Sequence, residues 1–212
     1  MKVSELVKTL SRKVPEIPSP SLGLEQYTTP PEIAVEVAVH AMLSGLLDND
    51  GLVLDIGAGT CMLSLPVLLL SDSVFVVAVE ADVRLGSLCL NASKELGVHD
   101  RVLYVGQVIG TGMDPPLYRR PVLVLTNPPF GVWRKGADWE LLGYGLRSGA
   151  SRVYAILKSG NMSIHARRAK AMGYKARLLW KRRFPIKASM ERHRSRVRWI
   201  DVDVIAFDRE KG

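Results

Sequence analysis

The sequence predicts an α/β fold with a doubly wound, mainly parallel sheet of seven strands and an antiparallel hairpin at its edge. Short runs rich in Val, Leu and Ile alternate along the chain with longer segments of helical pattern. Such alternation is typical of strand–helix–strand units, whose parallel strands are covered by helices on both faces. The chain then closes with two strand-like runs and no helix between them, which favours an antiparallel hairpin.

The first 23 residues are predicted to form a short helix and a linker ahead of the main domain. Residues 1–13 carry apolar side chains at helical spacing, namely Val3, Leu6, Val7 and Leu10. Three prolines at positions 15, 18 and 20 then favour an extended path. The main domain is expected over residues 24–212, which suffice for one substantial hydrophobic core. Its last third, residues 158–212, is set apart by its charge.

The first helix of the main domain has clear start signals. Thr29 is predicted to cap it, prolines follow in its first turn, and Glu32 comes next. This helix is expected to run to about Leu47. Further helices are predicted at residues 62–70, 82–96, 138–146 and 163–172. The strands are predicted at residues 52–56, 74–79, 101–105, 121–125, 153–157, 176–181 and 197–207.

The net charge of +8 is concentrated in the C-terminal third. Residues 158–212 hold 16 Lys and Arg against 5 Asp and Glu, whereas residues 1–157 hold 13 against 16. A face of this kind fits a polyanion such as RNA, and an ion-paired surface in a thermophile is the alternative. Phe184 and Trp199 nearby are expected in the core. The predicted phosphate contacts are Arg167, Arg168, Lys170, Lys181, Arg182, Arg183, Arg192, Arg194, Arg196 and Arg198.

Neither a membrane span nor a metal site is predicted. No apolar run reaches the roughly 18 residues that a membrane helix needs. The start of the chain lacks the apolar core of a signal peptide, so a cytoplasmic location is expected. The two cysteines, Cys61 and Cys89, cannot build a disulfide framework and have no CxxC partner for a metal. The four histidines are scattered along the chain.

A cofactor site is predicted where the first two strands end. Gly57 and Gly59 follow the first strand and allow a tight turn with close ligand approach. Glu80 ends the second strand, where a carboxylate can accept hydrogen bonds from both ribose hydroxyls. A dinucleotide site would need a third glycine, which is missing here. Asp55 instead suits a cationic ligand, and S-adenosylmethionine carries both a sulfonium and an ammonium group.

The loop before the first helix of the main domain is a second part of this site. It is expected to fold over the methionine end of the cofactor. Gln26 and Thr28 offer polar contacts, and Tyr27 can pack on the cofactor or on a target base. On spacing alone, a plain linker with a helix cap explains this loop equally well.

The sequence Asn127-Pro128-Pro129-Phe130 directly follows the predicted fourth strand. The Asn127 side-chain oxygen and the Pro128 carbonyl can each accept one hydrogen of a planar exocyclic amine, which turns the nitrogen lone pair toward a methyl donor. Phe130 can stack on the base, an interaction worth roughly 1–3 kcal/mol. The prolines fix an extended path, so that the acceptors are preset. Asn-Pro also starts ordinary turns, which is the simpler interpretation.

Together these residues resemble the class I methyltransferases with a Rossmann-like fold. More closely, the chain resembles the methyltransferase-like protein five family and its archaeal relatives, which are ribosomal RNA adenine-N6 methyltransferases. The likeness runs from about residue 22 to 208. The stretches that carry it include Leu24-Glu25-Gln26-Tyr27-x-Thr29-Pro30, Asp55-x-Gly57-x-Gly59 and Asn127-Pro128-Pro129-Phe130-Gly131.

The resemblance implies roles for the matching residues. Cofactor contacts would come from Gln26, Tyr27, Thr29, Asp55, Gly57 and Glu80, and the adenine would be held by Asn127, Pro128 and Phe130. The chain departs from the family at two positions. Cys61 stands where the family has glycine, and Gln107 stands where an acid accepts a hydrogen bond from the cofactor's adenine. The amide oxygen of Gln107 can still accept that bond, so we expect weaker cofactor affinity rather than loss.

The expected reaction is methylation of an adenine N6 amine in small-subunit ribosomal RNA, by positioning, without a metal or a covalent intermediate. The target base must leave its stack to reach the site. Other planar acceptors are the alternatives, namely guanine N2, DNA adenine or a protein glutamine. A non-catalytic RNA-binding assembly module on the same fold is a further one. The resemblance also implies a small zinc-binding activator subunit that covers an apolar surface and a sheet edge.

Overall fold

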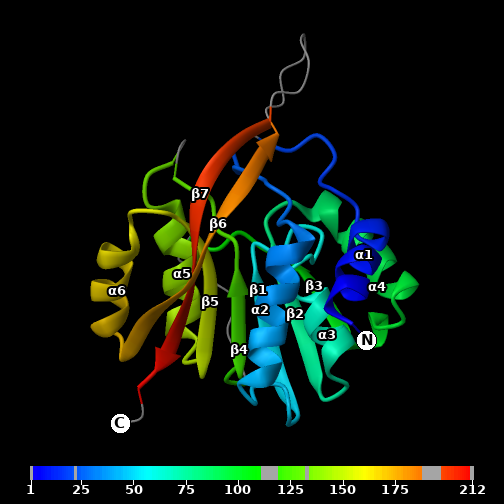
Figure 1. The fold of residues 1–212 in the computed structure, drawn as a ribbon, viewed down its shortest axis with the longest axis horizontal. Helices are drawn as coiled ribbons and strands as arrows, with labels where there is room; N and C mark the ends of the chain where they lie inside the picture. Colours follow the sequence, from blue (N-terminus) through cyan, green and yellow to red (C-terminus); the bar gives the residue numbers. More distant parts are fainter. Residues whose placement is uncertain (1, 22, 111–118, 132–133, 188–196, 211–212) are drawn as a thin grey trace.

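The computed structural model of the chain describes residues 2–21, 23–110, 119–131, 134–187 and 197–210. Its sheet has seven strands in the order β3-β2-β1-β4-β5-β7-β6 (Figure 1). Strands β1 to β5 are parallel to one another, β7 runs antiparallel to β5, and β6 runs antiparallel to β7. The predicted fold class is therefore confirmed.

The elements lie close to their predicted positions. The strands are Gly51–Ile56 (β1), Val74–Glu80 (β2), Val102–Gly106 (β3), Leu123–Thr126 (β4), Arg152–Lys158 (β5), Tyr174–Lys187 (β6) and Val197–Arg209 (β7). The α-helices are Val3–Lys13 (α1), Pro31–Leu43 (α2), Leu65–Leu70 (α3), Gly86–Glu95 (α4), Ala137–Arg147 (α5) and Met162–Lys170 (α6). Two short 3₁₀ helices are Val83–Leu85 (η1) and His99–Arg101 (η2).

Both faces of the central strands are covered, which explains their continuous apolar runs. On one face, α1, α2, α3 and α4 pack against alternate residues such as Val53 and Leu125. On the other face, α5 and α6 pack against the intervening residues such as Leu54 and Val124. Helix α1 contributes Leu6 and Leu10 to the first cluster. Within the described residues, no helix combines the length and apolar character needed to cross a membrane.

Several predicted boundaries are wrong for local reasons. Helix α2 ends at Leu43, because Ser44 caps it and Gly45 adopts a left-handed φ of 70°. It begins after Pro30 without a side-chain cap, so Thr29 does not cap it. Helix α3 begins at Leu65 rather than at residue 62. Strand β6 extends to Lys187, well beyond the predicted residue 181, because it pairs with β7 along its length.

The extended part of the β6–β7 hairpin rises past the end of the sheet to which the β4 arrow points (Figure 1). Phe184 is fully buried there, as expected. Trp199 is 51% exposed, so its predicted core position is wrong. It lies under the guanidinium of Arg183, which is 5.2 Å from the centre of a Trp199 ring. The reason is the register, since Trp199 pairs with Pro185 and thus faces away from Phe184.

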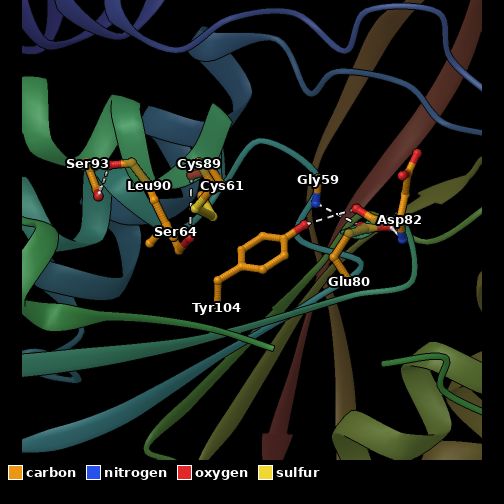
Figure 2. The surroundings of a disulfide bond; sticks show 9 residues. All are labelled: Gly59, Cys61, Ser64, Glu80, Asp82, Cys89, Leu90, Ser93 and Tyr104. Atoms are coloured by element: carbon orange, nitrogen blue, oxygen red, sulfur yellow. Dashed lines mark hydrogen bonds between the residues drawn. A yellow bond between two sulfur atoms is a disulfide. The ribbon is translucent and has the colours of Figure 1, made fainter. Parts of the chain in front are cut away.

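Cys61 and Cys89 form a disulfide, which the sequence did not predict (Figure 2). The bond joins the turn after β1 to α4, and both residues are fully buried. Cys61 has a left-handed φ of 64°, which costs a residue with a side chain about 1–2 kcal/mol. The backbone at Cys61 therefore has a conformation that glycine adopts more easily, and the disulfide holds the cysteine in this conformation.

Two double variants separate the bond from the backbone strain. The cysteines are 28 residues apart, for which chain-entropy arguments give about 3–4 kcal/mol of stabilisation. We expect Cys61→Ala with Cys89→Ala to lose an amount of this order in denaturant unfolding. Cys61→Gly with Cys89→Ala should recover about 1 kcal/mol, because glycine adopts the positive φ without strain. Equal unfolding free energies for the two variants would contradict the strain at Cys61.

Candidate active site

A cavity of about 140 Å³ lies at the carboxyl ends of the parallel strands. Asp55 and Glu80 come from the ends of β1 and β2, and Gln107 and Asn127 directly follow β3 and β4. The strand order reverses between β1 and β4, which is where open α/β sheets bind ligands. All the predicted cofactor residues line this cavity, namely Gln26, Tyr27, Thr28, Thr29, Asp55, Gly57, Gly59, Glu80, Gln107 and Asn127.

Asp55 is a buried carboxylate without a strong partner. Its residue is 1% exposed, and neither carboxylate oxygen has a hydrogen-bond partner of good geometry among the described residues. Burial raises the pKa of Asp55 to about 7, the charge of Glu80 adds to this, and the nearby Ser64 opposes it. The arrangement suits a cationic ligand, which would stabilise the ionised form.

The turn after β1 brings the backbone close to the cavity. Gly57 and Gly59 have left-handed φ values of 69° and 56°. The N–H groups of Gly57 and Ala58 donate to the carbonyl of Val79 at 2.9 and 3.1 Å, which ties the turn to β2. A side chain at Gly57 would also come within 3.1 Å of Leu141. The positive φ therefore favours glycine here, and a larger residue would also press against Leu141.

Glu80 is held by two backbone N–H groups (Figure 2). Its two oxygens accept hydrogen bonds from the N–H groups of Gly59 and Asp82, each at 2.9 Å. Burial raises the pKa of Glu80, and these N–H groups work against the rise. Each carboxylate oxygen has more than one lone pair, so each can still accept a hydroxyl from a ligand.

The loop over the cavity is anchored by its own polar side chains. Gln26 donates from Nε2 to Asp82 Oδ2 at 3.0 Å and accepts from the Ser21 N–H at 2.7 Å. The Thr28 hydroxyl accepts from the Ile17 N–H at 3.0 Å. Gln26 and Thr28 thus line the cavity while their polar groups hold the loop in place. The anchoring role of Asp82 was missed by the sequence analysis, although its position two residues after Glu80 was visible.

Asn127 has one satisfied and one unsatisfied polar atom. Its Nδ2 donates to the Thr29 hydroxyl at 3.0 Å, and its buried Oδ1 has no hydrogen-bond partner among the described residues. An unpaired buried acceptor is costly, so a native protein retains one mainly at a functional site. Thr29 therefore orients Asn127 across 98 positions of sequence, a role that the sequence analysis did not foresee.

The neighbouring residues of the Asn-Pro-Pro-Phe motif differ in their access to the cavity. Pro129 lines it, whereas Pro128 and Phe130 are absent from its described lining. Phe130 is 5% exposed and packs against Tyr27 and Phe184. The structure thus brings the motif to the site, with the Phe130 ring covered.

The predicted phosphate contacts that the structure describes lie on α6 and on the β6–β7 hairpin. Arg167, Arg168 and Lys170 are exposed on α6, and the Arg168 guanidinium lies 5.0 Å from the centre of a Trp139 ring. On the hairpin, Arg182 is bound to Glu36 at 2.8 and 3.0 Å, whereas Lys181, Arg183 and Arg198 are exposed. The other three predicted contacts, Arg192, Arg194 and Arg196, lie outside the described residues.

Asp55 should make the stability of the ligand-free protein fall as pH rises. Its folded-state pKa is about 7 and the unfolded value is about 4, so unfolding releases a proton between these limits. Within that window the stability contribution of Asp55 falls by about 1.4 kcal/mol per pH unit. Asp55→Asn removes this term, and its stability relative to the wild type should increase from pH 5 to pH 7. Denaturant unfolding at several pH values measures the difference, and a constant difference would contradict the raised pKa.

Known proteins resemble this chain along nearly its whole length. It is 33% identical over 196 residues to the rRNA N(6)-adenosine-methyltransferase Mettl5 of Drosophila melanogaster, which covers 89% of this chain and 88% of the relative. It is 26% identical over 210 residues to METTL5 of Danio rerio, covering 98% of this chain and 99% of the relative. No protein-family model matches.

A solved structure agrees with this relationship. The candidate RNA methyltransferase PH1948 from Pyrococcus horikoshii has a TM-score of 0.84 and 27% sequence identity, and the match covers 100% of this chain and 99% of the other. The fold, the cavity at the switch point of the sheet and the Drosophila relative lead to one assignment. The chain belongs to the family of rRNA N(6)-adenosine-methyltransferases that includes Mettl5.

Proposed function

We propose that the protein transfers a methyl group from S-adenosylmethionine to the N6 amine of an adenine in small-subunit ribosomal RNA. The observation that carries this proposal is the buried Asn127 Oδ1 at the end of β4, an acceptor without a partner among the described residues. An RNA-binding assembly module would have no need of such an acceptor. The names of the relatives support N6 methylation of adenosine in rRNA.

The residues around the cavity fit the cofactor. Asp55 would face its cationic methionine end, because this buried carboxylate has no described protein cation to balance it. Glu80 would accept from the ribose hydroxyls, and Gln107 would accept from the adenine amine at the end of β3. S-adenosylmethionine supplies a methyl group already activated by its sulfonium. The protein therefore needs to orient the two partners and to exclude water.

The target amine would lie between two acceptors. Asn127 Oδ1 and the Pro128 carbonyl would accept its two hydrogens and direct its lone pair toward the methyl group. As the new N–C bond formed and the bond between the methyl carbon and sulfur broke, the nitrogen would become positive, and both acceptors would stabilise that charge. Thr29 keeps the Asn127 amide from turning, since it binds Nδ2. The excess proton then leaves to water, and no side chain has to act as a base.

The RNA would approach over the β6–β7 hairpin, which extends past the cavity end of the sheet (Figure 1). Exposed Arg183 and Arg198 would contact its phosphates. Arg198 lies close enough to the loop for its charge to act on Tyr27. Arg182 is less suited, because Glu36 already binds its guanidinium. A cytoplasmic location goes with this substrate.

The free edge of the sheet fits the small zinc-binding activator subunit. No described strand lies outside β3. Phe75 and Leu103 are 54% and 60% exposed. They share a face, because Leu103 pairs with Val77, two residues after Phe75. Val83 and Val108 near this edge are also exposed. We propose that the activator covers these residues, and any zinc would belong to it.

Replacing Asn127 tests the proposed reaction. Removing one stabilising contact to a transition state costs about 10²–10³-fold in kcat. We expect Asn127→Ala to lose methyl transfer by this factor while the protein still binds S-adenosylmethionine. Thr29→Val should lose less, because Asn127 keeps its Oδ1 acceptor but its amide is no longer held in one orientation. The measurement is methyl incorporation into small-subunit ribosomal RNA, followed by mass spectrometry of the nucleosides.

The same assay also shows which results would contradict the proposed reaction. N2-methylguanosine as the product would replace the adenine assignment, as would transfer to DNA or to a glutamine peptide. Binding of RNA without any methylation, with the activator present, would favour the assembly module. If Asn127→Ala transferred methyl groups at the wild-type rate, Asn127 Oδ1 would have no part in catalysis.

A charged substitution at the β3 edge tests whether the activator subunit binds there. Leu103→Asp should abolish the complex with an archaeal activator subunit, because burying an unpaired carboxylate is strongly unfavourable. Leu43→Asp is the matched control, since Leu43 is 78% exposed on α2, away from β3. Mixing the purified proteins and measuring the mass of the complex gives the result. A complex that survives Leu103→Asp would exclude this edge as the binding surface.

A further inference from the structure

The Phe130 ring that would stack on the target base is already covered by Tyr27. The two rings are nearly parallel, with an angle of 14° between their planes and 5.5 Å between their centres. Phe184 packs edge-on against Phe130 at 5.5 Å and 81°. Phe130 is consequently only 5% exposed. In the free protein, the Phe130 ring is therefore not exposed for a base to stack on.

A base cannot enter between the two rings as they stand. Carbon atoms of stacked rings are separated by about 3.5 Å, so two rings that enclose a base lie about 7 Å apart. The separation here is too small by this measure. An adenine held at Asn127 and stacked on Phe130 therefore requires the space that the Tyr27 ring occupies.

A second cavity offers the Tyr27 ring another position. It has a volume of about 340 Å³ and lies against the linker and the start of α2. Tyr27 lines this cavity as well as the first one. The other residues that define it include Val14, Ile17, Met62 and Pro185. Its mixed apolar and polar lining suits a phenol ring with its hydroxyl.

The contacts of the loop allow the ring to move while the backbone stays. Gln26, Thr28 and Thr29 are each fixed by side-chain hydrogen bonds, to Asp82, Ile17 and Asn127. The contact between Tyr27 and Phe130 is a stacking contact. Rotation about the Tyr27 side-chain bonds can therefore exchange one cavity for the other without displacing Asn127 or the cofactor residues.

We propose that Tyr27 occupies the target-base position in the free protein and swings into the second cavity when an adenine enters. The proposal rests on the proposed function, because it places the base at Asn127. Tyr27 thereby keeps Phe130 out of water and makes every incoming base compete with an aromatic ring. Purines stack more strongly on an aromatic ring than pyrimidines, so adenine displaces the Tyr27 ring from Phe130 more readily than uracil or cytosine does. Tyr27 is in this way an autoinhibitory residue at the base position rather than only a cofactor contact.

Fluorine NMR tests the movement directly. The wild-type protein is labelled with 3-fluorotyrosine, and the resonance that is missing from labelled Tyr27→Phe belongs to Tyr27. The probe is the oligonucleotide r(A)5, added to saturation in the presence of S-adenosylhomocysteine, with r(U)5 as the comparison. We expect r(A)5 to shift the Tyr27 resonance as the ring leaves Phe130, and r(U)5 to shift it much less. A resonance that stays in place while r(A)5 binds would overturn the proposal.

A variant without the ring gives an independent result. Tyr27→Ala should bind r(A)5 several-fold more tightly than the wild type, whereas Tyr27→Phe, which keeps the ring, should not. Leu43→Ala, on the exposed end of α2, is the control for handling and folding. Equal or weaker binding by Tyr27→Ala, including no measurable binding by either protein, would overturn the proposal. Its failure is distinguishable from failure of the methyltransferase assignment, because the latter would also abolish methylation of ribosomal RNA by the wild type.

Discussion

The hydrogen bond from Asn127 to Thr29 is the contact on which the arrangement of the site depends. It joins the end of β4 to the loop before α2. Without it, the amide of Asn127 could present either its oxygen or its nitrogen to the cavity. With it, the nitrogen is occupied, and the oxygen remains an acceptor that no described residue pairs with. The same hydrogen bond holds the loop that carries Tyr27. One contact therefore positions residues on both the cofactor side and the base side of the site.

The site is built from groups that are unfavourable in the free protein. In the part of the chain that the structure describes, Asp55 is buried without a cation, Glu80 is buried next to Asp82, and Asn127 Oδ1 has no hydrogen-bond partner. Each is placed at the end of a parallel strand whose remaining length is packed on both faces. The stability of the sheet therefore offsets the cost of these groups. A cationic ligand and a planar amine would each relieve part of that cost, which gives the site its selectivity for both.

The arrangement of strands could be predicted because periodicity along the chain reflects burial. Parallel strands covered on both faces give continuous apolar runs, and Asp55, Glu80 and Asn127 stand out because they end such runs. Contacts between distant segments could not be predicted in this way. Thr29 has the residue type and position of a helix cap, and only the fold reveals that it binds Asn127. The pairing of Cys61 with Cys89 and the exposed side of Trp199 likewise depend on how elements pack and register.

The two halves of the site differ in how firmly they are held, and this difference matches their tasks. On the cofactor side, the disulfide of Cys61 and the bond from Gly59 to Glu80 fix the turn after β1. A small ligand of constant shape gains from such a preformed site, because little ordering is needed on binding. On the base side, Tyr27 and Phe130 meet through a ring contact that can be exchanged. A base that has left an RNA stack can replace the Tyr27 ring on Phe130, because both are aromatic rings that stack in the same way. The rigid cofactor side and the exchangeable ring contact on the base side therefore belong to one mechanism.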